Sequence, residues 1–197
     1  MREIDVYDFD KTLVPFDSGT KFAFFCALRY PWVALLMPLV GSGALLGICG
    51  LLSWKSFKKI CFSFMPFIPR DKAVKAFWDK YEGLVFPWFK ERQREAVIIS
   101  ASPDFLLCEI QKRLGFEGLI CTRHNKKTGK ILGENCRSEE KVRRFYEEYG
   151  REDIRVCNVY SDSLTHDKPI FSLAEESCFH IVNGERQEFN YKDKFKE

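Results

Sequence analysis

The chain alternates between short apolar runs and longer segments whose apolar residues recur every three or four positions. Runs of the first kind are typical of buried strands, and segments of the second kind are typical of helices with one buried face. Because helical segments separate most of the apolar runs, the pattern predicts an α/β fold with a parallel sheet. The predicted strands lie at residues 4–8, 96–99, 118–122, 129–133, 154–160 and 178–182.

Capping residues and helix breakers mark the expected helix ends. Asp17 or Ser18 can cap a helix that ends at Arg29, before Pro31. A second clear case begins at Asp104 and is stopped by Gly115. Further helices are predicted after Ser53, at 71–85, at 139–149 behind Ser138 and at 167–174, and residues 183–197 are expected to be a frayed tail.

Composition narrows the class of protein. With 197 residues, of which 46% are hydrophobic, the chain can bury a core in one domain plus an insertion. A net charge of +3 is too small to indicate nucleic acid as a partner. The eight cysteines form no C-x-x-C pair and predict reduced thiols, and the spacing of Cys121, His124 and Cys136 fits no zinc site. Because the N-terminus lacks an apolar signal core, we expect a cytoplasmic location.

Residues 30–52 stand out because these 23 residues carry no charge. A run of that length can cross a bilayer as one helix. Proline and glycine interrupt it, however, and Gly41-Ser42-Gly43 predicts a turn between two short helices. In the following segment, 53–94, ten lysines and arginines stand against four acids, which suits an anionic substrate or surface.

Polar residues follow three of the predicted strands. Asp8-Phe9-Asp10-Lys11-Thr12 follows the first, Ser100 follows the strand at 96–99, and Asp162 follows the strand at 154–160. The carboxyl ends of parallel strands share one edge of a sheet, so these side chains are expected to converge on a ligand. Carboxylates that repel one another need a cation, and an all-oxygen set suits Mg²⁺. Taken alone, the first pair of aspartates fits a capped turn equally well.

Lys141 is a candidate for the positive charge that a phosphate requires. It lies in the first turn of the helix predicted behind Ser138. Taken alone, it is better explained as a solvated lysine among the charged residues of that helix.

Together and in this order, these residues resemble the four motifs of the haloacid-dehalogenase-like phosphatases. The resemblance covers the whole chain and rests on residues 8–12, 98–102, 141 and 160–163. It implies a Rossmann-like catalytic core at 1–15 and 92–197, with a parallel sheet flanked by helices. It also implies a helical cap of the first type at 16–91, with the apolar hairpin 30–52, as in the phosphoserine-phosphatase-like branch. Similarity to bacterial phosphatidylglycerophosphatases of the C type rests on Arg29-Tyr30-Pro31, Tyr160-Ser161-Asp162-Ser163 with Lys168-Pro169, and Val182-Asn183-Gly184-Glu185.

The resemblance also implies roles for the acidic residues. Asp8 would attack phosphorus and form an aspartyl-phosphate, while Asp10 would protonate the leaving oxygen and later activate water. Asp8, the backbone carbonyl of Asp10, and Asp162 would hold Mg²⁺. In the family a second acid usually stands four residues later, where this chain has His166, so Asp167 is kept as a doubtful further metal ligand. Thr12, Ser100 and Lys141 would bind the phosphoryl oxygens.

The position of the apolar run restricts its topology. The strand that leads to Asp8 precedes the run, and the other motifs follow it. Both ends of the run must therefore lie on the same side of a membrane for the site to assemble. A single crossing is therefore excluded, and a hairpin that enters one leaflet or lies at the interface, or a buried cap core, remains. Cations flank the run at Lys21, Arg29, Lys55, Lys58 and Lys59.

We therefore expect a Mg²⁺-dependent phosphomonoesterase on the cytoplasmic side of a bacterial membrane, peripheral or re-entrant. Its expected partners are the membrane surface and a lipid phosphate such as phosphatidylglycerophosphate. One alternative is a soluble phosphatase of a small, phosphoserine-like metabolite. Another is a catalytically idle, membrane-associated scaffold. The oligomeric state stays open.

Overall fold

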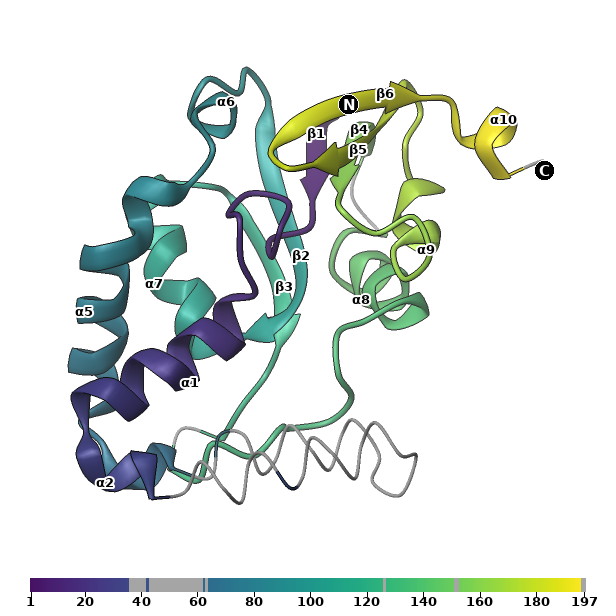
Figure 1. Cartoon of the computed structure of the whole chain (residues 1–197). Coiled ribbons are helices and arrows are strands. Elements are labelled where there is room, and N and C mark those ends of the chain that lie inside the picture. The colour runs from purple at the N-terminus through teal and green to yellow at the C-terminus, as the bar shows by residue number, and fades with distance from the viewer. Residues whose placement is uncertain (36–41, 43–61, 63, 126, 151–152, 196–197) are drawn as a thin grey trace.

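A mostly parallel sheet forms the centre of the protein (Figure 1). The computed structural model describes residues 1–35, 42, 62, 64–125, 127–150 and 153–195. In this part of the chain the strand order is β3-β2-β1-β4-β5-β6, and only β5 and β6 pair antiparallel. The predicted α/β class is therefore confirmed. The strands are β1 Arg2–Tyr7, β2 Glu95–Pro103, β3 Gly118–Thr122, β4 Ile154–Ser161, β5 Ser177–Val182 and β6 Glu185–Phe189.

Helices cover both faces of the sheet, which explains why its central strands are apolar on both sides. In Figure 1, α1 (Ser18–Arg29), α5 (Arg70–Tyr81) and α7 (Asp104–Leu114) lie on one side, and α8 (Glu139–Tyr149) and α9 (Lys168–Phe171) lie on the other. In β1, Tyr7 belongs to the apolar cluster of the first side. Ile4 and Val6 belong to the cluster of the second side and are fully buried.

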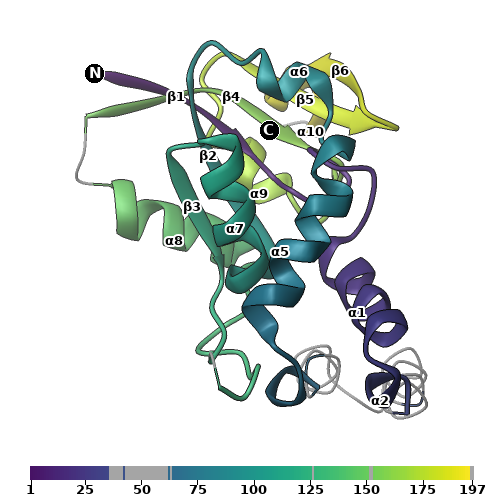
Figure 2. The same cartoon turned by 90° about the vertical axis from the view of Figure 1, so that its left-hand side faces the viewer.

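The helices between β1 and β2 pack directly onto the sheet and α7. Asp17 caps α1, as predicted, because its side chain accepts a hydrogen bond from the Thr20 backbone N–H at 2.7 Å. Figure 2 shows α1 and α5 next to each other, and the Phe22 and Phe77 rings meet edge to face at 5.5 Å. Trp78 on α5 donates to the Leu106 carbonyl of α7 at 2.9 Å. One apolar cluster thus joins these helices to the sheet, and the division into core and cap stays a prediction.

The same connection contains shorter elements. A four-residue helix, α2 (Pro31–Ala34), begins at the proline that was expected to interrupt the preceding helix. A short helical turn at Met65–Phe67 precedes α5, and another at Glu82–Leu84 follows it, before α6 (Pro87–Lys90). The predicted hairpin within 30–52 and the helix after Ser53 fall almost entirely outside the described residues. Within those residues, no helix is long and apolar enough to cross a membrane.

Two predictions about local structure are wrong. Residues 129–133 form no strand, because Gly129 and Gly133 turn the chain at positive φ and only an isolated bridge joins His124 to Ile131. The described part of the expected frayed tail, residues 183–195, is ordered instead, since it contains β6 and α10 (Tyr191–Phe195). Asn183 and Gly184 adopt positive φ angles of 52° and 87°. Asn-Gly is the commonest sequence for such a two-residue hairpin turn, so the signal for β6 was present in the chain.

Candidate active site

The loop after β1 folds back on itself and brings Thr12 beside Asp8. The Asp8 backbone N–H still donates to the Tyr160 carbonyl of β4 at 2.9 Å, while Lys11 adopts a positive φ of 58°. The Thr12 hydroxyl then donates to Asp8 Oδ2 at 3.4 Å and accepts the Asp162 backbone N–H at 2.9 Å. The sequence prediction that residues after β1 and β4 meet at one edge of the sheet thus agrees with the positions of Asp8, Thr12 and Asp162.

Lys141 points from α8 into this group of acids. Its Nζ lies 2.7 Å from Asp8 Oδ1 and 2.8 Å from Asp167 Oδ1, and only 2% of the residue is exposed. The alternative of a solvated helix lysine is therefore wrong for Lys141. Burial alone would lower the pKa of Lys141, but the two carboxylates outweigh burial and raise that pKa above its usual value.

Asp167 reaches the site despite its one-residue offset. After β4, the Asp167 backbone N–H bonds back to the Ser163 carbonyl at 3.1 Å, so the extra residue is taken up by a turn. The Ser161 hydroxyl donates to Asp167 Oδ2 at 2.6 Å. Carboxylate oxygens of Asp8, Asp162 and Asp167 all lie within 4.8 Å of one another. His166, at the family's usual position, is exposed.

The Asp10 carboxylate does not join this group of acids and instead contacts the start of α1 and the end of β2. Its Oδ1 accepts the Ser18 backbone N–H at 2.9 Å, and its Oδ2 accepts a short hydrogen bond from the Ser102 hydroxyl. Burial, followed by the negative charge of Asp17, raises the pKa of Asp10 to about 6. Ser18 was foreseen only as a possible helix cap and Ser102 only as part of the second motif, so their contact with Asp10 was missed.

Ser100 is buried within β2 and not after its end, because the strand runs on to Pro103. Its hydroxyl accepts the Ser102 backbone N–H at 3.1 Å, where the pairing of β2 with β3 becomes irregular. Among the described residues, no hydrogen bond joins Ser100 to Asp8 or Lys141. Its predicted role toward phosphate therefore stays a prediction.

The charges at the Asp8 site favour a bound cation. Burial, with the like charges of Asp167 and Asp10, raises the pKa of Asp8 to about 8, against the opposing effect of Lys141. Burial and Asp167 likewise raise the pKa of Asp162. Among the described residues, Lys141 is the one cation that forms ion pairs with these carboxylates, and the possible ligand atoms are all oxygens. These residues therefore fit Mg²⁺, which prefers oxygen ligands and is usually bound through one or two carboxylates.

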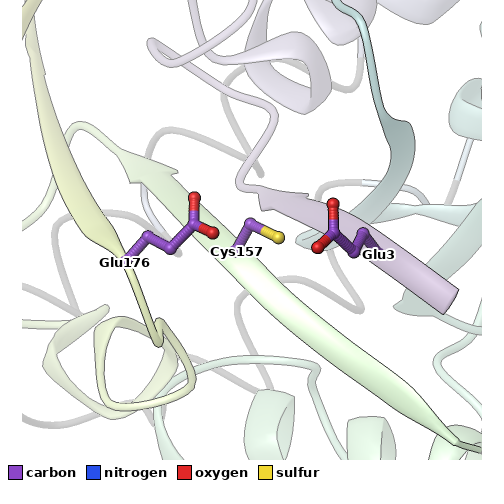
Figure 3. A group of neighbouring side chains, drawn as sticks. All are labelled: Glu3, Cys157 and Glu176. Carbon is purple, nitrogen blue, oxygen red and sulfur yellow. The ribbon is translucent and has the colours of Figure 1, made fainter. Parts of the chain in front are cut away.

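A second group of possible ligands fits a metal less well. Figure 3 shows Glu3 of β1, Cys157 of β4 and Glu176, next to β5, side by side, and their ligand atoms lie within 4.8 Å of one another. Arg155 already pairs with Glu3 at 3.1 Å and with Glu176 at 3.0 Å. Arg94 approaches the same two carboxylates at 3.6 and 3.4 Å. This group is an ion-pair network in which arginines take the place of a metal.

With the site's geometry known, comparison with known proteins identifies the family. The model of the haloacid dehalogenase-like hydrolases matches residues 6–172. The chain belongs to this family. Protein CicA of Caulobacter vibrioides, in two strains, is 32% identical over 127 residues, which are 62% of this chain and 52% of that protein. The chain thus spans about half the length of the curated relatives that it matches.

Two solved structures share the fold. A protein of unknown function from Bordetella pertussis Tohama I superposes with a TM-score of 0.67 at 19% identity, over 78% of this chain and 77% of that chain. A phosphoserine phosphohydrolase-like protein from Francisella tularensis superposes with a TM-score of 0.54 at 18% identity, over 91% and 87%. At these identities the likeness concerns the fold. The family resemblance is confirmed, and the similarity to C-type phosphatidylglycerophosphatases stays a prediction.

Proposed function

We propose that this hydrolase is a Mg²⁺-dependent phosphomonoesterase that works through an aspartyl-phosphate at Asp8. The observation that supports it most is the buried Asp8 carboxylate, held at 2.7 Å by Lys141 among further carboxylates. Lys141 on Oδ1 and Thr12 on Oδ2 fix the orientation of the nucleophile. Phosphoryl transfer depends mainly on such positioning and on neutralising charge, which makes this arrangement well suited to it.

The proposed reaction has two halves. A carboxylate oxygen of Asp8 forms a bond to phosphorus while the ester P–O bond breaks, and Asp10 gives its proton to the leaving oxygen. Asp10 then takes a proton from water, which attacks phosphorus and releases inorganic phosphate and the Asp8 carboxylate. A carboxyl whose pKa is raised to about 6 can serve as acid and then as base near neutral pH.

The remaining residues of the site would bind the metal and the phosphoryl group. Asp8, Asp162, the Asp10 carbonyl and Asp167 would hold Mg²⁺, which when bound supplies positive charge opposite the phosphoryl oxygens. Thr12, Ser100 and Lys141 are proposed to bind those oxygens. An ammonium group has three hydrogens to donate, so Lys141 has one left for phosphate beyond its bonds to two carboxylates.

The test is phosphate release by the purified chain, measured with p-nitrophenyl phosphate in Mg²⁺ and after chelation with EDTA. We expect Asp8→Asn to abolish release, and chelation to suppress it until Mg²⁺ is restored. Asp193→Asn, at an exposed position on α10, is the matched control and should behave like wild type. Unchanged release by Asp8→Asn would refute the proposed mechanism.

A lipid phosphate at the cytoplasmic membrane surface is the substrate that we propose on a separate observation. A cleft of about 420 Å³ on the outer side of α1 and α5 is lined by Lys21, Arg29 and Lys80, together with apolar side chains. Within the described residues, no salt bridge joins these three cations to a carboxylate. Phe24 and Leu28 of the same cleft are 62% and 88% exposed. Exposed apolar groups with unneutralised cations suit the surface of an anionic bilayer.

Vesicles and a substrate panel separate this proposal from its alternatives. We expect the chain to sediment with anionic phosphatidylglycerol vesicles and to hydrolyse phosphatidylglycerophosphate faster than phosphoserine. The triple change of Lys21, Arg29 and Lys80 to Glu should weaken sedimentation, and the same change at the exposed Lys72, Lys75 and Lys112 should not. Hydrolysis of soluble esters without vesicle binding would favour the metabolite phosphatase, and vesicle binding without hydrolysis would favour the scaffold.

A further inference from the structure

Two buried serines hold the carboxylate of Asp10. Carboxylate oxygens of Asp8, Asp162 and Asp167 lie within 4.8 Å of one another, and the Asp10 carboxylate does not belong to this group. The Ser102 hydroxyl donates to Asp10 Oδ2, and the Ser18 backbone N–H donates to Oδ1 at 2.9 Å. Ser18 is fully buried and Ser102 is 5% exposed, so water does not compete freely for these bonds.

The two serines also bond to each other, and their hydroxyl hydrogen bonds form a chain that runs from Ser18 through Ser102 to Asp10. The Ser18 hydroxyl donates to Ser102 Oγ at 2.9 Å, and Ser102 in turn donates to Asp10. The Ser102 backbone N–H is taken by Ser100 Oγ at 3.1 Å, which fixes the backbone of Ser102 as well. A hydroxyl has one proton, so Ser102 can donate to Asp10 because its oxygen accepts from Ser18. The rotamer of Asp10 is therefore determined from two sides.

This arrangement joins three separate parts of the chain. Asp10 lies in the loop after β1, Ser102 lies near the end of β2, and Ser18 is the first residue of α1. A Cβ added at Gly19 would meet the Phe62 ring at 3.4 Å and Pro103 at 3.8 Å, so α1 begins in close contact with the end of β2. The orientation of the Asp10 carboxyl consequently depends on how α1 is seated against the sheet.

A purely structural explanation would make Asp10 a cap of α1. Asp17 already fills that role, since its Oδ1 accepts the Thr20 backbone N–H at 2.7 Å. The Ser102 hydroxyl contributes nothing to helix capping, yet it donates a hydrogen bond to Asp10 Oδ2. The structural explanation therefore accounts for the Ser18 N–H bond and not for the Ser102 bond.

We propose that Ser102, supported by Ser18, is a positioning residue that aims the Asp10 carboxyl at the oxygen of the leaving group. The inference rests on the proposed phosphatase function. During cleavage, Asp10 gives its proton to the oxygen that departs from phosphorus, and Ser102 keeps its own proton. An alkoxide leaving group is a strong base and needs that proton, whereas p-nitrophenolate departs without it. The contribution of Ser102 must therefore depend on the leaving group.

The experiment compares wild type and Ser102→Ala in full-length protein with Mg²⁺, on a series of substituted phenyl phosphates and one alkyl phosphate. For the most basic leaving groups we expect kcat/KM, which reports ester cleavage and not the later attack of water, to fall about 10- to 100-fold, a part of what general acid catalysis contributes. For p-nitrophenyl phosphate we expect kcat/KM to change by less than about threefold. Ser102→Thr, which retains a hydroxyl, should restore most of the loss.

Two further variants keep the result interpretable. Ser18→Ala retains the backbone N–H on Asp10 and loses only the hydroxyl behind Ser102, so it should show the same leaving-group dependence with a smaller loss. Ser172→Ala, at an exposed position whose hydroxyl bonds to the Pro169 carbonyl, should match wild type. If Ser102→Ala does not fold, judged by circular dichroism, Ser18→Ala alone decides the question.

No loss of kcat/KM with any leaving group, or an equal loss of kcat/KM with every leaving group, would overturn the inference and leave the phosphatase intact. A wild type that hydrolyses none of these esters would overturn the proposed function and this inference together.

Discussion

Two groups of acidic side chains lie toward opposite ends of the same strands, β1 and β4, and they differ in burial and pairing. At the carboxyl ends, Asp8 and Asp167 are buried around one ammonium group, that of Lys141. Toward the other end, Glu3 and Glu176 (Figure 3) are 48% and 34% exposed by side chain. The guanidinium groups of Arg94 and Arg155 bridge these two carboxylates. Both groups satisfy the same distance criterion for a metal site.

The difference shows that proximity of ligands is a weak argument for a metal. Exposed carboxylates are solvated and their pairs contribute little to stability. Buried carboxylates have lost that solvation, and the pKa of Asp8 rises to about 8 because one lysine does not compensate for burial and its like-charged neighbours. Burial that leaves negative charge under-neutralised therefore favours a bound cation.

The largest effect that distinguishes the two groups concerns activity. We expect Asp8→Asn to lower phosphate release by at least about 1,000-fold, since removing a nucleophile leaves only binding and electrostatic effects. Glu3→Gln at the opposite end should leave the rate within about twofold of wild type, because Glu3 belongs to an exposed ion-pair network. Steady-state rates of both purified variants provide the measurement. Comparable losses in both would contradict the distinction.

Stability should distinguish the two groups next. Lys141→Met leaves two buried carboxylates without their cation, and we expect the free energy of unfolding to fall by about 3 kcal/mol, as for breaking a buried pair. Urea denaturation in EDTA measures it. Lys192→Met, on the exposed part of α10, is the control and should change little. A fall of less than about 1 kcal/mol for Lys141→Met would show that the buried pair behaves like a surface pair.

Mg²⁺ itself should stabilise the folded chain through the first group only. At about 100 times its dissociation constant, a ligand of the folded state adds roughly 2.7 kcal/mol. We expect this increase in wild type and in Glu176→Gln, and a clear reduction in Asp162→Asn. The readout is the urea midpoint with and without Mg²⁺. If the increase disappears in Glu176→Gln, the ion binds at the group of Glu3 and Glu176, and the prediction is wrong.

The smallest effect concerns the ion pairs of Glu140, which lies on the same helix as Lys141 and is 15% exposed by side chain. Hydrogen bonding to Arg143, and then to Arg144, lowers the pKa of Glu140 to about 2 against the opposing effect of burial. Because the folded pKa lies below the ordinary value of 4.5 for a glutamate, the stability that Glu140 contributes is present above about pH 4.5 and is lost as the pH falls toward 2. Glu140→Gln should cost less than about 1 kcal/mol at neutral pH. Its difference from wild type should vanish in acid, as measured by urea denaturation at several pH values.

Much of the fold was predictable because its signals are local. Asp17 as the cap of α1 and Gly115, at a positive φ of 64°, as the end of α7 both follow from backbone preferences of single residues. The β5–β6 hairpin was missed although Asn183-Gly184 is an equally local signal, since the polar residues after it do not resemble a buried strand. Strand β6 is mostly exposed and pairs along the edge of the sheet, so alternation of apolar residues could not reveal it.

The candidate site likewise has features that the sequence predicted and features that it did not. The sequence by itself determined the order of the motifs, the placement of Asp8 and Asp162 after parallel strands, and the family to which they point. These depend on spacing and strand direction, which a chain carries in its order. Membrane contact of residues 30–52 and the core and cap boundaries stay predictions.

Only the tertiary structure decided what each side chain touches. It showed Lys141 buried between Asp8 and Asp167, brought Asp167 into the site in spite of its offset, and turned Asp10 toward Ser102. Lys141 and Asp8 are separated by 133 positions, and Ser102 and Asp10 by 92. Burial and rotamer at such contacts are set by packing between distant segments, which no local pattern encodes. The motif at Asp8 thus specified the edge of the sheet at which the candidate site lies, and the packing of α1 and α8 specified the contacts of its side chains.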